Sequence, residues 1–367
     1  MGTIKYLVKL TPHEKFYFGG EQTFGEKSGK DDTTETNYLV KSNYFPQQTS
    51  ILGLIRHQLL IQSDENVFKE NKIQDSIEAS KLIGESGFSD SAKFPLGKIH
   101  SISPVFLSKN TGESDAAFFF PANKEYQKYT KFNDSCTEVP VNLFLELVEN
   151  AAGAFILKDF DPKYPFDDFL INKANTKLKY DDVFIEKRQV GIHKNYDGSS
   201  DDDAYFIQSF YTFKKTDNHF FSFSFIVELD DSAKFETKQV VTFGGEQQLF
   251  KLEVIPNFKQ VFEQLIPDYE ATTDFDKVVL VSDAYVENNE IFQKSAFAIT
   301  ETIDFRFIKT CVSKSANYYN KPEKSRKVNL IKRGSVFYGD IKLISESLKN
   351  DTFNKIGYNI YKIINKK

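Results

Sequence analysis

An aromatic strand pattern between residues 220 and 230 constrains the fold most. Apolar side chains alternate there with smaller or polar ones, in the order Phe221, Ser222, Phe223, Ser224, Phe225, Ile226, Val227, Glu228 and Leu229. A period of two predicts a half-buried β-strand. Phenylalanine and tyrosine favour strands, and the chain of 367 residues holds 37 and 18 of them with no tryptophan. The sequence therefore predicts a sheet-rich protein.

Similar patterns predict further strands and a few helices. The expected strands are Lys5 to Leu10, Ala204 to Phe213, Gln248 to Ile255, Lys277 to Val286 and Ser335 to Ile344. The expected helices are Ser50 to Gln62, Val141 to Leu157 or part of it, and Phe258 to Leu265. Strands with occasional helices indicate an α+β fold, with antiparallel sheets covered on one face.

The stretch from Ser42 to Leu60 combines a turn, a helix start and a basic helical face. Pro46 fixes the entry, and Thr49 or Ser50 can cap the helix. Its apolar residues recur at helical spacing, at Ile51, Leu52, Ile55 and Leu59. We expect Gly53, Arg56 and His57 to share another face, where a negative group can be held. The structural alternative is that Gly53 permits close packing and that Arg56 is a solvated surface residue.

Length and composition indicate the broad class. A chain of this length with 40% hydrophobic residues can bury a large core in two domains. No apolar run approaches the roughly 20 residues that cross a bilayer, and no signal peptide precedes the first strand. We therefore expect a soluble cytoplasmic protein. Cys136 and Cys311 are isolated in the sequence, which argues against a disulfide framework.

Charge is unevenly distributed along the chain, although the net charge is only −5. Acidic pairs and triplets occur in segments that resemble loops, at 31–32, 167–168, 181–182 and 201–203. The segment from Lys321 to Arg333 carries six basic residues and one acidic residue. Such a basic patch can bind phosphates, or it can be an ordinary solvated loop.

Catalytic and metal-binding patterns are missing from the sequence. The five histidines, His13, His57, His100, His193 and His219, lack metal-ligand spacing, and no P-loop or nucleophile motif occurs. The carboxylates of 201–203 lie in a Gly-Ser loop that is typically solvated. His57 can act as a general base, but no second acid or base lies at a predictable spacing from it. We expect no enzyme activity, no metal and no cofactor.

A series of short segments, three of which contain glycine, follows the Ser42 to Leu60 stretch in a definite order. They are Ser101-Ile-Ser-Pro-Val-Phe-Leu-Ser-Lys109, Phe118-Phe-Phe-Pro-Ala-Asn123, Lys187-Arg-Gln-Val-Gly-Ile-His-Lys194, Phe243-Gly-Gly-Glu-Gln-Gln-Leu-Phe250 and Lys332-Arg-Gly-Ser-Val-Phe-Tyr338. This order resembles the family of third subunits of the Cmr complex, the type III-B CRISPR effector, within the repeat-associated RAMP superfamily. The resemblance spans residues 4 to 345.

The sequence departs from the family pattern in places. A Gly-Pro-Phe element is Ser103-Pro104-Val105-Phe106 here, and the Arg-Val-Gly-Ile element is interrupted by Gln189. Arg333 stands where the family has alanine in an Ala-Gly-Ser-Val element, and glycine-tryptophan elements of the C-terminal half have no counterpart.

The resemblance implies two ferredoxin-like (RRM-like) βαββαβ units with long inserted loops and a protruding hairpin. Residues 1–255 would form the N-terminal unit, with insertions near 63–98 and 159–204. Residues 256–367 would form the C-terminal unit. The 159–204 segment corresponds to the hairpin that folds over the guide RNA in relatives.

Candidate RNA-binding residues follow from the basic and glycine-rich segments together with the resemblance. They are Lys41, Ser42, Gly53, Arg56, His57, Lys187, Arg188, Gly191, His193, Lys194, Gly244, Gly245, Lys332 and Arg333. The glycines would expose backbone N–H groups, and the basic side chains would pair with phosphates.

The implied function is a non-catalytic subunit that caps the 5′ tag of the crRNA in antiviral defence. It would bridge the large polymerase-like signalling subunit and the adjacent backbone RAMP subunit. One alternative is the equivalent subunit of another type III subtype. A second is a RAMP endoribonuclease that processes precursor crRNA with His57 as the base, and a third is a β-rich carbohydrate- or protein-binding module.

Overall fold

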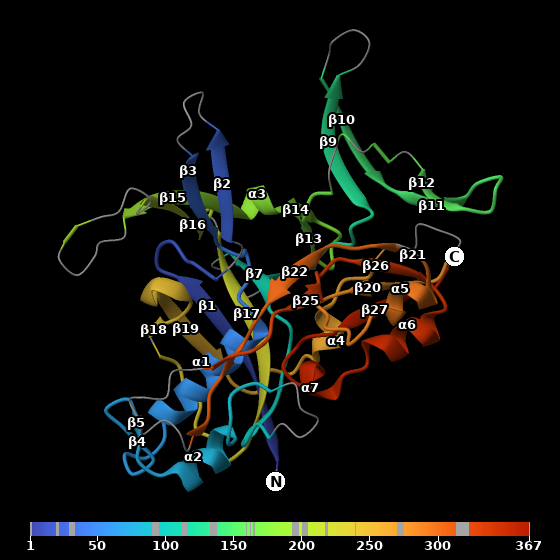
Figure 1. Ribbon diagram of the computed structural model, residues 1–367. Coiled ribbons are helices and arrows are strands. Elements are labelled where there is room, and N and C mark those ends of the chain that lie inside the picture. The colour runs from blue at the N-terminus through green and yellow to red at the C-terminus, as the bar shows by residue number, and fades with distance from the viewer. Residues whose placement is uncertain are drawn as a thin grey trace.

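The computed structural model covers most of the chain. It describes residues 2–366 except 20–21, 29–33, 90–94, 112–115, 133–137, 159, 162, 164–165, 193–197, 200–204, 217–218, 239, 270–274 and 313–322. Helices and mostly antiparallel sheets give an α+β fold, as predicted, although Tyr205–Phe213 and Thr34–Lys41 pair in parallel (Figure 1). Among the described residues, no helix is long and apolar enough to cross a membrane.

A large sheet forms the centre of the N-terminal half. Its strand order is β14-β13-β8-β7-β17-β1-β19-β18, and β6 also pairs with β17. The strands are β1 Thr3–Pro12, β6 Ile99–Ile102, β7 Phe106–Asn110, β8 Ala117–Pro121, β13 Phe169–Ile171, β14 Lys177–Lys179, β17 Phe220–Asp230, β18 Val241–Thr242 and β19 Leu249–Ile255. Strand β1 is antiparallel to both of its neighbours, β17 and β19.

Strand β17 confirms the alternating pattern but is more buried than predicted. Phe221, Phe223 and Phe225 pack into the main core, and Ser222 and Ser224 on the other face are also buried. The hydroxyl of Ser224 lies 2.8 Å from that of Ser108, and the hydroxyl of Ser222 lies 2.7 Å from that of Thr11. Paired hydroxyls satisfy each other, so the polar face can be covered without a large desolvation cost.

Helix α1, Gln48–Ile61, covers one face of this sheet. The residues predicted to face the core, Ile51, Leu52, Ile55 and Leu59, are all buried. The predicted cap is wrong, because Gln47 is the N-cap, with no side-chain hydrogen bond, and both Thr49 and Ser50 lie inside the helix. The Tyr358 hydroxyl of the C-terminal half takes the place of a local cap, because the backbone of Gln48 and Thr49 is hydrogen-bonded to it.

The C-terminal half has its own four-stranded sheet, with the order β21-β26-β20-β27. Its elements follow the chain as β20 Lys277–Leu280, α5 Glu290–Lys294, β21 Ser295–Ile299, β26 Val336–Gly339, α6 Ile341–Leu348 and β27 Tyr361–Ile364. Val278, Leu280 and Phe337 pack with residues of α5 and α6 on one face.

The opposite face of this small sheet packs against the large sheet. One apolar cluster joins Val279 and Tyr338 to Leu7, Phe106 and Ile226 of the N-terminal half. Lys277 and Glu125 form a buried ion pair within the same contact. The two halves therefore share a continuous core.

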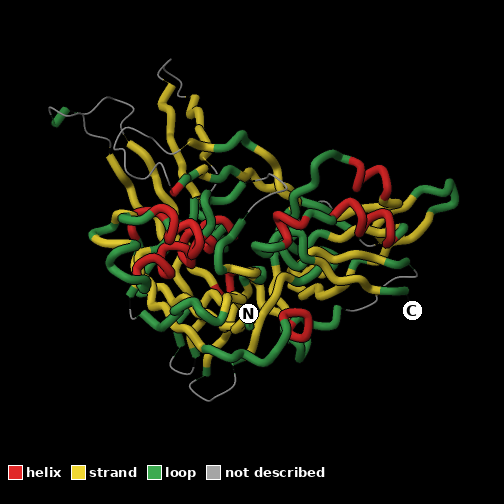
Figure 2. The backbone as a smooth tube through the Cα atoms, turned by 90° about the horizontal axis from the view of Figure 1, so that it is seen from below, coloured by secondary structure: helices red, strands yellow, loops and turns green. Residues whose placement is uncertain are grey.

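The remaining elements form hairpins and short connections. Figure 1 shows two hairpins extending from the body, β9 Tyr126–Phe132 with β10 Glu138–Phe144 and β11 Glu146–Glu149 with β12 Phe155–Lys158. A separate sheet has the order β15-β16-β3-β2, from Phe184–Ile192, Tyr205–Phe213, Thr34–Lys41 and Gln22–Ser28. Figure 2 shows strands running through the middle of the body.

Shorter elements complete the chain. Residues 63–98 include β4 Phe68–Lys69, β5 Lys72–Ile73 and helix α2 Ser76–Ile83. The other short elements are α3 Tyr180–Val183, η1 Gly245–Gln247, α4 Phe262–Leu265, β22 Thr302–Phe305, β23 Ile308–Lys309, β24 Glu323–Lys324, β25 Val328–Ile331 and α7 Asp351–Asn354. Within the predicted 159–204 insertion, Phe169–Ile171 is buried in the large sheet, and β15 is the exposed part.

Several predicted elements are wrong. The segment 141–157 is not a helix but contains parts of strands β10, β11 and β12. Val141, Leu143, Leu145 and Leu147 recur every second residue, which favours strands. Strand β20 ends at Leu280, α4 occupies only the end of 258–265, and the predicted strand 335–344 changes to a helix at Ile341. Asp340 causes that change, since its carboxylate caps α6 by accepting from Lys342 N and Leu343 N.

Candidate nucleic-acid interface

Two neighbouring pockets lie on either side of the segment 42–50, and both are lined by Gly19 and Gln47. The first, here called the charged pocket, has a volume of about 400 Å³ and is lined by Gly19, Lys41, Ser42, Asn43, Tyr44, Phe45, Gln47, Tyr180, Asp283, Glu301, Thr302, Ile303, Asp304, Lys332 and Arg333. The second, here called the glycine pocket, has a volume of about 500 Å³ and is lined by Phe18, Gly19, Gln47, Thr49, Ser50, Gly53, Leu54, His57, Thr242, Phe243, Gly244, Gly245, Gln247 and Arg306.

The segment between the pockets is held by both halves of the protein. Ser42 is buried, and its hydroxyl accepts a hydrogen bond from Phe18 N at 2.8 Å. Tyr358 of the C-terminal half donates from its hydroxyl to Gln47 Oε1 at 2.9 Å. Gln48 Nε2 donates to Ile356 O at 2.6 Å and to Ser103 O at 2.9 Å. These bonds fix the position of the start of α1.

The glycine pocket combines a helix start with a tight turn. Gly244 has φ +82°, and a Cβ there would lie 2.6 Å from Tyr17 O, so only glycine fits without a shift. Gly245 N donates to Tyr17 O at 2.8 Å, which ties the turn to the segment before β2. Gly53 is exposed on the first turns of α1 and leaves open space beside the turn.

The titratable side chains that line the glycine pocket are basic. Among the described lining residues, the titratable side chains are those of His57 and Arg306, and none carries a carboxylate. The His57 ring packs edge-on against Phe68, with centroids 6.0 Å apart. Partial burial lowers the pKa of His57 below its usual value. The pocket therefore offers an exposed guanidinium and a neutral imidazole to an anion.

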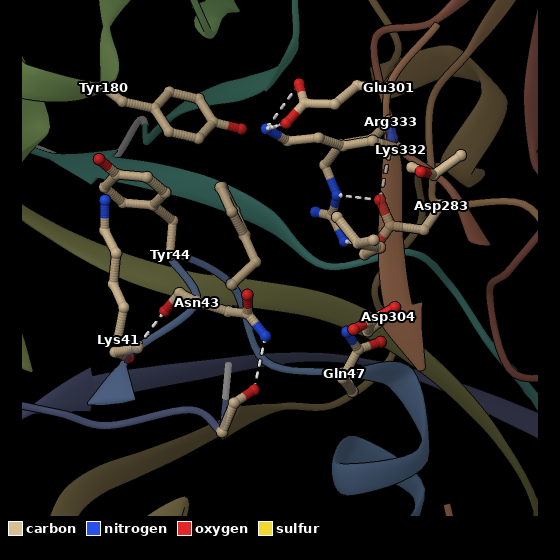
Figure 3. Close-up of a pocket in the computed structure, with 15 residues that line it drawn as sticks. Lys41, Asn43, Tyr44, Gln47, Tyr180, Asp283, Glu301, Asp304, Lys332 and Arg333 are labelled. Carbon is tan, nitrogen blue, oxygen red and sulfur yellow. Dashed lines mark hydrogen bonds and ion pairs between the residues drawn. The ribbon is translucent and has the colours of Figure 1, made fainter. Parts of the chain in front are cut away.

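The charged pocket has the opposite character, because its buried cations are already paired (Figure 3). Lys332 Nζ lies 2.6 Å from Asp168 Oδ2 and 3.1 Å from Glu301 Oε1. Lys124 contacts the same two acids, at 3.2 and 2.9 Å. Burial raises the pKa of Asp168, but the two lysines outweigh it and hold that pKa below its usual value.

Each of the three guanidinium nitrogens of Arg333 donates a hydrogen bond within the protein. It is only 5% exposed, and its Nη2 and Nε donate to Asp283 at 3.1 and 3.2 Å. Its Nη1 donates to Val105 O at 3.2 Å, and the guanidinium lies 4.6 Å from the centre of the Phe45 ring. These contacts consume the donors that Arg333 would offer to a phosphate.

Arg56 does not share the face of Gly53 and His57, contrary to the sequence prediction. It is 8% exposed, lines neither pocket, and its Nη2 donates to Gly84 O at 3.4 Å. Burial lowers the pKa of Arg56 to about 10. The segment around Gly87, which bonds to Thr310 O, covers it. At i+3 from Gly53 the helix has already turned Arg56 toward the body.

The predicted RNA-binding residues around Gly191 that the structure describes line neither pocket. Lys187, Arg188 and Gly191 belong to strand β15, and the Arg188 Nε donates to Glu186 Oε1 at 3.1 Å. A Cβ at Gly191 would lie 2.2 Å from the Phe206 ring, which explains the glycine. His193 and Lys194 lie outside the described residues. Of the predicted set, the pockets bring together Lys41, Ser42, Gly53, His57, Gly244, Gly245, Lys332 and Arg333.

Arg306 is the principal residue that sequence reasoning missed. It stands between Phe305 and Phe307, which are both buried, whereas Arg306 is exposed. A Phe-Arg-Phe alternation places the arginine on the solvent face of an extended segment. This signal was available in the sequence, but nothing in it indicated that the segment would lie beside α1.

Comparison with known proteins gives one family match. A family model described as CRISPR-associated protein (Cas_Cmr3) matches residues 8–365. No curated protein matches the chain. Two similar solved chains come from cryo-EM structures of the type III-B Cmr-beta complex, one bound to cognate target RNA and AMPPnP and one to cognate target RNA. Their sequence identities are 15% and 14%, with TM-scores of 0.46 and 0.45. The alignments cover 97% of this chain in each case, and 95% and 96% of the solved chains.

Proposed function

The chain belongs to the Cas_Cmr3 family of CRISPR-associated proteins, and from this premise we propose that it is a non-catalytic RNA-binding subunit of a type III-B effector complex. It caps the 5′ tag of the crRNA in a cytoplasmic ribonucleoprotein. It bridges the large polymerase-like subunit and the adjacent backbone RAMP subunit. This family favours the type III-B assignment over an equivalent subunit of another type III subtype.

The observation that carries the proposal is the charge asymmetry of the glycine pocket. The exposed Arg306 and the His57 imidazole meet there beside the open space over Gly53, and no described lining residue carries a carboxylate. Such groups bind phosphate oxygens without sequence preference. Eight of the fourteen predicted residues line this pocket or the charged pocket beside it.

We also propose that each half contains a ferredoxin-like unit, with a boundary near residue 256. In the C-terminal half the order β20-α5-β21-β26-α6-β27 and the sheet β27-β20-β26-β21 support this arrangement. In the N-terminal half the sheet order β19-β1-β17-β7 is equivalent, with α1 after β1. In the described part of the second crossover, the turn η1 takes the place of a helix.

Arg306 provides the direct test. We expect Arg306→Glu to weaken binding of a tag-bearing RNA by about tenfold at low salt, because it puts a negative charge beside the phosphate site. The slope of log affinity against log salt should also fall by about one or two. Fluorescence anisotropy of a labelled RNA at several salt concentrations measures both quantities.

Lys342→Glu is the matched control, with the same change in charge. Lys342 is exposed in the first turn of α6, where a glutamate is favourable for the helix. We expect wild-type affinity for this variant. Equal RNA affinity of Arg306→Glu and wild type at low salt would contradict the proposed site.

Because His57 lines the glycine pocket, we expect RNA binding to depend on pH. Its lowered pKa keeps the imidazole of the free protein neutral down to pH values below the usual 6.5, and a bound phosphate raises that pKa and favours protonation. Affinity should therefore rise as the pH falls from 8 to 6, by roughly threefold for one added charge contact. His57→Gln should remove this rise while leaving the affinity at pH 8 nearly unchanged. Anisotropy titrations at constant ionic strength provide the measurement.

A RAMP endoribonuclease is the second candidate, because His57 and Arg306 line one pocket. A general base beside a cation is part of a metal-independent ribonuclease site. Incubation of purified protein with repeat RNA in EDTA separates the two functions. Specific cleavage that His57→Ala abolishes would overturn the non-catalytic assignment, and binding without cleavage would support it.

A further inference from the structure

We propose that the charged pocket holds one unstacked nucleobase that carries an exocyclic amino group, while the glycine pocket holds the backbone phosphate beside it. This inference rests on the proposed RNA-binding function and deepens it. The shared lining residues Gly19 and Gln47 make the two pockets adjacent. A nucleotide whose phosphate lies beside Arg306 in the glycine pocket can therefore place its base across the segment 42–50.

The electrostatics of the charged pocket disfavour a phosphate. Lys332 and Arg333 are each held by carboxylates within 3.2 Å, so a phosphate would have to break buried ion pairs to reach them. The acids Asp283, Glu301 and Asp304 balance the cations Lys41, Lys332 and Arg333 among the described lining residues, so this lining has no net positive charge to attract a phosphate. A neutral polar ligand can bind in this pocket without breaking the buried ion pairs.

The shape of the pocket suits a flat ring. Tyr44 and Tyr180 stand on one side of the opening in Figure 3, with ring centroids 4.9 Å apart. Tyr44 is itself stacked on Tyr211, with centroids 4.3 Å apart, which fixes its orientation. The volume of about 400 Å³ lies in the range of pockets that bury small organic ligands. Aromatic walls of this kind hold bases splayed out of single-stranded RNA.

The polar groups of the pocket indicate the class of base. Asn43 Nδ2 donates to Gly19 O at 2.6 Å, which leaves Asn43 Oδ1 as an acceptor. Asp304 is exposed at the rim, and its Oδ2 contacts Lys327 at 2.6 Å. Gln47 Oε1 accepts from Tyr358. With respect to the described residues, Asp304 Oδ1 remains as an acceptor and Gln47 Nε2 as a donor. Two acceptors with one donor complement an amino group beside a ring nitrogen, as in cytosine or adenine.

Uracil is the informative competitor, because it matches cytosine in size and stacking. Cytosine presents two amino N–H groups on N4, whereas uracil presents a carbonyl oxygen at that position. A carboxylate accepts from the former and repels the latter. Wild-type protein should therefore bind r(C)8 more tightly than r(U)8 by roughly three- to tenfold.

The test measures anisotropy of labelled r(C)8 and r(U)8 with the full chain at pH 7.5. Asp304→Asn should lower the ratio of the two affinities toward one, since an amide can donate to uracil. Asp268→Asn is the matched control, because Asp268 is an exposed carboxylate that pairs with Lys362 at 3.3 Å away from both pockets. This control should keep the wild-type ratio.

The outcomes separate this inference from the proposed function. Equal affinity for the two octamers, or a ratio that Asp304→Asn leaves unchanged, would overturn the base pocket. If binding then still weakens with salt and with Arg306→Glu, the RNA-binding function stands. If neither octamer nor a tag-bearing RNA binds in a salt-dependent manner, the proposed function itself fails.

Discussion

Replacement of Lys277 by methionine is expected to lower the free energy of unfolding by about 3–5 kcal/mol. Lys277 and Glu125 are both buried, and Lys277 Nζ lies 2.8 Å from each carboxylate oxygen of Glu125. The Tyr338 hydroxyl and Asn123 Nδ2 also donate to this carboxylate. Removal of the ammonium group leaves a negative charge in the shared core of the two halves. Urea unfolding followed by circular dichroism measures the loss.

Two further variants distinguish the charge from the packing. Glu125→Gln combined with Lys277→Met removes both charges, and should be more stable than Lys277→Met alone. Lys294→Met breaks a partly exposed pair with Glu290 at 3.0 Å, and should cost at most about 0.5 kcal/mol. A loss below about 1 kcal/mol for Lys277→Met would contradict a buried charge at this contact.

Gly357→Ala is the second variant with a large expected effect. Gly357 has φ +88°, and a Cβ there would lie 2.1 Å from Gln48 Nε2 and 2.6 Å from Ser103 C. Because Gln48 fixes the start of α1, the clash should displace the segment between the two pockets. We expect a loss of about 3 kcal/mol in unfolding free energy, from backbone strain and broken hydrogen bonds together. Weaker RNA binding should accompany it.

Gly153→Ala is the matched control for this variant. Gly153 also has positive φ, +77°, but the nearest atom to its Cβ position is Glu149 Oε1 at 3.6 Å. Only the strain of an alanine at positive φ applies there. The free energy of unfolding should therefore fall by about 1 kcal/mol, and the RNA affinity should be unchanged. Urea unfolding and anisotropy on both variants make the comparison. Equal losses for the two glycines would show that the contact with Gln48 does not matter.

The sequence predicted correctly those elements in which regularly spaced apolar residues form the face that packs into the core. Strand β17 and helix α1 followed from spacings of two and of three to four residues. The segment 141–157 was predicted wrongly because its apolar content was read as helical, although its residues alternate along β10 and β11. Sheet order depends on contacts between distant segments, such as β1 with β17 and β19, and no local pattern encodes it.

The candidate site was predictable in part for the same reason. Gly53, His57, Gly244 and Gly245 were selected from local motifs, and the fold brings them into one pocket. The pairing of Lys332 with Asp168 and of Arg333 with Asp283 joins residues far apart in the sequence. A basic dipeptide therefore looked like a phosphate contact, although its charges are neutralised within the protein.

Photo-crosslinking tests the central claim most directly. A tag-bearing RNA with a photoreactive nucleotide at each tag position in turn would be irradiated with the protein, and the linked peptides identified by mass spectrometry. The account predicts crosslinks to the segments 42–57, 242–247 and 302–307, which line the two pockets. Arg306→Glu should reduce these crosslinks. Crosslinks confined to other surfaces, such as the β9–β12 hairpins, would contradict it.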